Sequence, residues 1–140
     1  MDPMIREWEF YFLQEDGYEN RFIVAKAFLK FWDDNSIEKL DVPGRCMLGG
    51  KIFGREGFND GDEIFTSIIE TIERIKCSDC SDTQHDLMCA TTLSGSKYYF
   101  YSNDYNVYMF MMFGDLIHMD ELNPRPYFYL KPKLYSSNLI

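Results

Sequence analysis

The chain of 140 residues has a mass of 16.6 kDa, the size of one ordinary domain. Its composition, 46% hydrophobic and 17% aromatic, argues against disorder. The formal net charge of -9 argues against direct nucleic-acid binding and against an anionic membrane surface, because neither would attract the chain electrostatically. We therefore expect a single domain over residues 1–140 that meets other proteins rather than nucleic acids or membranes.

The first predicted element is a strand from Trp8 to Leu13. Trp8, Phe10 and Phe12 alternate with more polar residues, and a period of two with aromatic side chains is typical of a strand with one solvated face. Asp16-Gly17 predicts a turn directly after this strand.

The segment from Arg21 to Trp32 has two readings. As a strand, it places Ile23, Ala25, Ala27, Leu29 and Phe31 on one apolar face. As a helix, it sets its two lysines one turn apart and contains two favourable alanines. We prefer the strand because a turn precedes it, and the helix remains the alternative.

The middle of the chain predicts two further strands. Arg45 to Phe53 reads as a strand that Gly49-Gly50 interrupts with a bulge or a close backbone approach. Asn59-Asp60-Gly61-Asp62 predicts a tight turn. Ile64 to Ile75 is rich in β-branched residues, which favours a strand, although an amphipathic helix is the competing reading.

The last third predicts a hairpin, a helix and a tail. Ala90–Leu93 and Lys97–Tyr101 form the hairpin around Ser94-Gly95. Tyr105 to Phe113 is apolar nearly all round and predicts a buried helix. Residues 123–140 contain three prolines and predict an extended tail. Together the elements predict an α+β fold: a small, β-rich domain with an antiparallel sheet and one or two helices.

The N-terminal residues and the apolar runs of the sequence indicate the cellular compartment. Met1-Asp2-Pro3-Met4 has neither the basic nor the apolar segment of a secretory signal, and no run reaches the length of a membrane span. We expect a cytoplasmic protein whose cysteines stay reduced.

One spacing in the chain suits a metal. Cys77, Cys80, His85 and Cys89 lie within one short polar stretch, and sulfur and imidazole ligands are those that a structural Zn²⁺ takes in a tetrahedral site. The alternative is a polar loop that binds no cofactor, with Cys89 in the following strand.

Charge is unevenly distributed along the chain. Residues 1–20 hold six acids and one base, and residues 56–82 hold eight acids and two bases. The tail from Leu122 has the three bases Arg125, Lys131 and Lys133 and no acid. This distribution suits docking on a basic protein partner, or self-association into a homo-oligomer through the tail.

The stretch from Gly50 to Ser67 carries a motif. Gly50, Ile52, Phe53, Gly54, Phe58, Asp60, Gly61, Ile64, Thr66 and Ser67 match a pattern found in small uncharacterised proteins of bacteria and their phages, which the chain resembles. Thr92, Ser94-Gly95 and Tyr98 resemble a later element of the same proteins, and Arg55-Glu56 stands where those relatives often carry His-Pro. The resemblance implies a small β-rich domain in a mobile-element context and brings no catalytic residues.

These observations favour a non-enzymatic, acidic domain that binds another protein as an accessory or regulatory factor. The main alternative is a small-ligand protein or enzyme with its site near Thr66, Ser67 and His118, whose hydroxyls and imidazole could contact a ligand. A zinc-stabilised interaction module is a further alternative.

Overall fold

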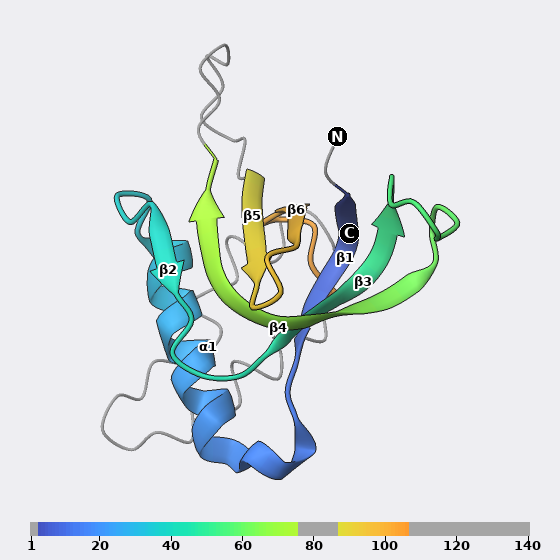
Figure 1. The fold of residues 1–140 in the computed structure, drawn as a ribbon. Coiled ribbons are helices and arrows are strands. Elements are labelled where there is room, and N and C mark those ends of the chain that lie inside the picture. Colours follow the sequence, from blue (N-terminus) through green and yellow to red (C-terminus); the bar gives the residue numbers. More distant parts are fainter. Residues whose placement is uncertain (1–2, 76–86, 107–140) are drawn as a thin grey trace.

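The computed structural model describes residues 3–75 and 87–106. In these two stretches six strands form one mixed sheet and one α-helix, preceded by a short 3-10 helix (Gln14–Asp16), packs against it (Figure 1), which confirms the predicted α+β, β-rich class. Most of the predicted helix from Tyr105 to Phe113 and the whole predicted tail lie outside the described residues. Tyr105 itself forms an isolated parallel bridge with Trp8.

The sheet closes on itself. Its strands are β1 (Met4–Tyr11), β2 (Lys39–Asp41), β3 (Met47–Phe53), β4 (Glu63–Arg74), β5 (Leu87–Thr92) and β6 (Lys97–Tyr101). From β3 to β6 each strand pairs antiparallel with the next, and β1 lies between β3 and β6, antiparallel to β3 and parallel to β6. The pairings β3–β4–β5–β6–β1 therefore form a ring, to which β2 is added at the edge of β4.

The length and bend of β4 allow this closure. Its first half pairs with β3, whereas its second half pairs with β5 along the opposite edge, and the strand curves strongly between them (Figure 1). The buried residues Thr66, Ile69 and Ile72 follow each other at intervals of three, so the strand shifts its phase as it bends. β4 confirms the strand predicted over Ile64–Ile75, and its helical reading is wrong.

A β-bulge divides β1. Ile5 and Trp8 are both fully buried although they are three residues apart, and the register against β3 shifts between Arg6 and Glu9. Glu7 takes up the extra residue with a φ of +52°, in the left-handed region. Gly50 lies opposite, where an added Cβ would stand 2.6 Å from the carbonyl oxygen of Arg6, so the bulge needs a glycine there.

The predicted strand over Arg21–Trp32 is wrong, because helix α1 (Gly17–Asp33) contains the whole segment. The residues that it buries are spaced as on one side of a helix: Val24, Ala25, Phe28, Leu29, Phe31 and Trp32. Both lysines of the segment are exposed, as the helical alternative requires.

The core is centred on Trp8. Its ring contacts Phe28 of α1 at 5.6 Å between centroids and Phe100 of β6 at 4.9 Å. Its indole N–H donates to the carbonyl oxygen of Tyr101 at 2.7 Å, which satisfies the one polar atom of the buried ring. Trp8 thus joins β1, α1 and β6.

Tight turns connect the strands that carry the candidate sites. Between β3 and β4 the backbone N–H of Gly61 donates to Ile52 at 2.7 Å, and Gly61 has a φ of +92°. The Asp60 carboxylate accepts the N–H of Gly54 at 2.9 Å. The predicted Asp-Gly turn and the predicted hairpin around Ser94-Gly95 are both confirmed.

Candidate functional site

The predicted zinc ligands Cys77, Cys80 and His85 lie outside the described residues. Cys89, the fourth, lies in β5 with 5% of its surface exposed. Across residues 3–75 and 87–106, no three His, Cys, Asp or Glu side chains come together as a metal site would require. The zinc site stays a prediction, and so does any role of His118, which also lies outside the described residues.

The structure brings the two halves of the sequence motif together. Ser67 of β4 and Ser94 of the β5–β6 turn lie with their Oγ atoms 3.3 Å apart. Thr92 Oγ1 lies 2.9 Å from the same Ser94 Oγ, which makes a chain of three hydroxyls. These residues were far apart in the sequence, and the pairing of β4 with β5 is the reason that they meet.

Thr66 has a structural task. Its hydroxyl accepts the backbone N–H of Leu48 at 2.9 Å and donates to the carbonyl oxygen of Ser67 at 2.7 Å. The side chain is 4% exposed and lies where β3 and β4 shift register. Both capacities of the hydroxyl are therefore used within the sheet, and only Ser67 of the predicted pair offers its hydroxyl to a ligand.

We call one groove, beside the start of β4 and the β5–β6 turn, the arginine groove. It has a volume of about 470 Å³, and its lining includes Arg55, Phe58, Glu63, Ser67, Ser94 and Tyr98. The Arg55 guanidinium carbon lies 5.1 Å from the centre of the Tyr98 ring and 5.5 Å from that of Phe58. These cation–π contacts hold a flexible side chain over the groove.

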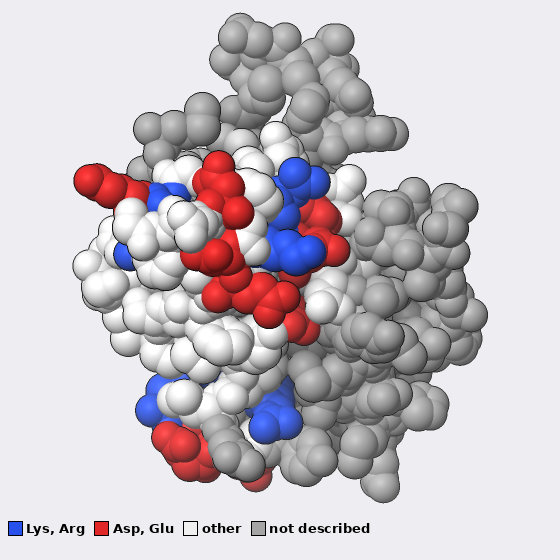
Figure 2. Space-filling view, turned by 90° about the vertical axis from the view of Figure 1, so that its right-hand side faces the viewer, with Lys and Arg blue, Asp and Glu red and all other residues white. Residues whose placement is uncertain are grey.

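The second groove, which we call the acidic groove, lies over β1, β3 and the start of β4. It has a volume of about 450 Å³, and its lining includes Glu7, Glu9, Tyr11, Lys51, Glu63 and Phe65. Figure 2 shows this side of the molecule, on which acidic side chains gather with a few basic ones between them. Glu63 and Phe65 line both grooves.

An aromatic pair forms one wall of the acidic groove. The rings of Tyr11 and Phe65 meet edge to face, with centroids 4.3 Å apart, and Phe65 is 63% exposed. A Cβ added at Gly49 would stand 2.7 Å from Tyr11 Cδ2, still closer to Cε2, and 3.1 Å from Phe65 Cδ1. The predicted close approach at Gly49-Gly50 is thus confirmed, and at Gly49 it makes room for this pair.

The charges of the acidic groove are not balanced. Lys51 Nζ pairs with Glu7 at 2.6 Å, and this contact raises the pKa of the lysine. Glu9 accepts a hydrogen bond from the Tyr11 hydroxyl, and Glu63 makes no ion pair within the described part of the chain. Burial, followed by the bond to Glu9, raises the pKa of Tyr11 to about 12, so this hydroxyl remains a donor. Among the described residues the groove thus holds three carboxylates and a single lysine, and neither Glu9 nor Glu63 forms an ion pair there.

The sequence indicated the two acidic segments but did not predict that they lie side by side in the fold. Glu7 and Glu9 come from the first acidic segment and Glu63 from the second, and they share a groove because β3 pairs with both β1 and β4. For Tyr11 and Phe65 the sequence indicated only that they are aromatic, and nothing in it predicted that they line a groove. Arg55 stood out only because it departs from the motif.

No helix within the described ranges is long and apolar enough to cross a membrane. Comparison with protein-family models, with curated proteins and with solved structures gave no match to this chain.

Proposed function

We propose that this chain is a non-enzymatic accessory or regulatory domain that binds a basic segment of another protein through the acidic groove. The observation that supports the proposal is the convergence of Glu7, Glu9 and Glu63 beside an exposed aromatic ring. Opposite charge on a partner accelerates encounter and selects against wrong partners.

The chemistry of the groove favours an arginine or lysine side chain of the partner. Glu9 and Glu63 form no ion pair within the described residues, and an ammonium or guanidinium group between them would offset their negative charge. Tyr11 and Phe65 offer ring surface on which a cation is attracted by the π-electrons. An aromatic and acidic lining together bind cations more selectively than acids alone.

Fluorescence polarisation with a labelled peptide of alternating arginine and glycine tests the proposal. We expect saturable binding that weakens as the salt concentration rises, because salt screens exposed charges. The triple substitution Glu7→Gln, Glu9→Gln and Glu63→Gln should weaken binding by about tenfold or more, as expected for lost charge complementarity.

The matched control carries the same number of substitutions at the exposed acids Glu56, Glu70 and Glu73, none of which lines the acidic groove. Equal loss of affinity in the two triple variants would show that only net charge matters and would overturn the proposal. Sedimentation of the free protein decides whether a second copy, through the bases of its tail, is the partner. In that case the groove triple variant would be monomeric and the control would not.

A further inference from the structure

We infer that the arginine groove is a second binding site, for a small zwitterionic molecule, namely an aromatic amino acid or a short peptide that contains one. This inference does not rest on the proposed function. It rests on two charges of opposite sign, a chain of hydroxyls and exposed rings that line one groove.

Arg55 supplies the positive charge. Two aromatic rings hold its guanidinium, and it makes no ion pair with any acid in residues 3–75 or 87–106. Its N–H donors therefore remain available, and their planar fork matches the two oxygens of a carboxylate. A carboxylate bound there would be held by paired, charge-assisted hydrogen bonds.

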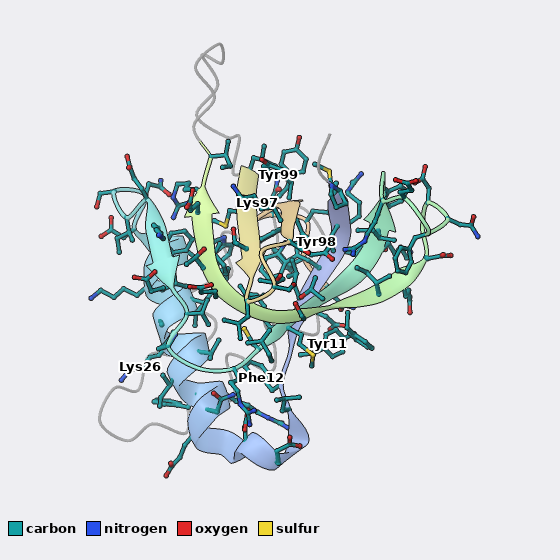
Figure 3. The ribbon with its side chains drawn as sticks, in the orientation of Figure 1. Tyr11, Phe12, Lys26, Lys97, Tyr98 and Tyr99 are labelled. Carbon is teal, nitrogen blue, oxygen red and sulfur yellow. The ribbon has the colours of Figure 1, made fainter. Side chains whose placement is uncertain are left out.

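Hydroxyl groups supply further donors. Tyr98 lies within the curve of β4 in Figure 3, is only 4% exposed, and its hydroxyl makes no hydrogen bond within the described stretches. Ser67 and Ser94 add the exposed end of the hydroxyl chain that begins at Thr92. Tyr98 lines the groove, so its hydroxyl is a donor for a ligand oxygen bound there.

Glu63 and the exposed rings narrow the class of ligand. A simple anion would meet repulsion from the Glu63 carboxylate, which lines the same groove and has no ion pair among the described residues. A ligand that also carries an ammonium group would instead be attracted to the Glu63 carboxylate through that group. Phe58 and Phe65 are exposed beside the two charges, so an aromatic side chain of the ligand would have ring surface to contact.

The test is a titration of the full chain, followed by two-dimensional amide NMR, with three probes that differ in charge. L-phenylalanine carries both charges, 3-phenylpropionate lacks the ammonium, and phenethylamine lacks the carboxylate. We expect saturable shifts at Arg55 and from Ser94 to Lys97, strongest with phenylalanine and weaker with each probe that lacks one of the two charges. Comparison with glycyl-L-phenylalanine shows whether the free amino acid or a peptide binds more tightly.

Two substitutions make the test specific. Arg55→Gln should weaken phenylalanine binding by about tenfold, as the loss of a charged hydrogen-bonding pair implies, while leaving the arginine–glycine peptide unaffected. Glu63→Gln should weaken phenylalanine and strengthen 3-phenylpropionate. Arg45→Gln is the matched control, because Arg45 is exposed and pairs with Asp16 instead. Equal affinity in the Arg55 and Arg45 variants, phenethylamine binding as tight as that of phenylalanine, or no saturable shift would overturn the inference.

Discussion

Replacement of Gly49 by alanine tests whether the aromatic wall of the acidic groove depends on a missing side chain. Gly49 lies in β3 without a positive φ, so alanine meets no backbone strain and the perturbation is steric. The new methyl group would overlap the Tyr11 ring and press on Phe65. Overpacking of this kind costs about 1–3 kcal/mol. Without the overlap, alanine would stabilise a strand interior by roughly 0.5–1 kcal/mol relative to glycine.

A double-mutant cycle with Tyr11→Ala separates these two contributions. Once the Tyr11 ring is gone, the remaining neighbour is Phe65, which is exposed and free to turn away. We expect Gly49→Ala to destabilise the natural chain and to be neutral or stabilising in the Tyr11→Ala background. The coupling free energy should be about 1–3 kcal/mol, measured by urea unfolding with the fluorescence of the buried tryptophans. The same change in unfolding free energy in both backgrounds would refute the steric explanation.

Two further predictions concern hydroxyl groups. Thr66→Val should lower the free energy of unfolding by about 1–3 kcal/mol, because the buried N–H of Leu48 loses its acceptor. The control Thr71→Val should change it by about a few tenths of a kcal/mol, because Thr71 is half-buried and its side chain makes no hydrogen bond to any described residue. A similar loss in both variants would contradict the role given to Thr66. The pKa of Tyr11 is raised from 10.0 to about 12, so its neutral form stabilises the fold below pH 10 and this contribution is lost as the pH rises from there towards 12. Unfolding free energies across that range should fall more steeply for the natural chain than for Tyr11→Phe, and parallel curves would exclude the shift.

The error at α1 has a physical origin in two overlapping patterns. Ala25, Leu29 and Phe31 satisfy both the alternation of a strand and the buried side of a helix. Phe28 and Trp32 distinguish the two readings, because a strand would leave these large rings on the face of the lysines. The turn at Asp16-Gly17 favoured a hairpin, and this pattern was given more weight than the placement of Phe28 and Trp32. In β4 the β-branched residues, whose rotamers are restricted in a helix, predicted the strand correctly. This segment does not bury one side of a helix, so the helical pattern in it was misleading.

The candidate site was predictable only in part, because strand pairing is not local in sequence. The segment charges indicated an acidic surface, and Gly49-Gly50 indicated a close approach. No local signal predicts a bulge with glutamate at positive φ, yet the bulge at Glu7 sets which residues of β1 face the groove. The hydroxyl chain of Ser67 and Ser94 likewise exists only once β4 and β5 are aligned.

The closure of the sheet also governs how the chain can fold. Trp8 bonds to a carbonyl 93 residues further along the chain, and β1 pairs with β6, the last strand described. During synthesis the first strand is made long before its second neighbour, so one of its edges has no native partner until β6 emerges. Contacts of such sequence separation slow folding, because a long loop must be closed before they form. We therefore expect chains that end before β6 to aggregate through the open edges of β1 and β5, and ring closure to be a late step on the folding pathway.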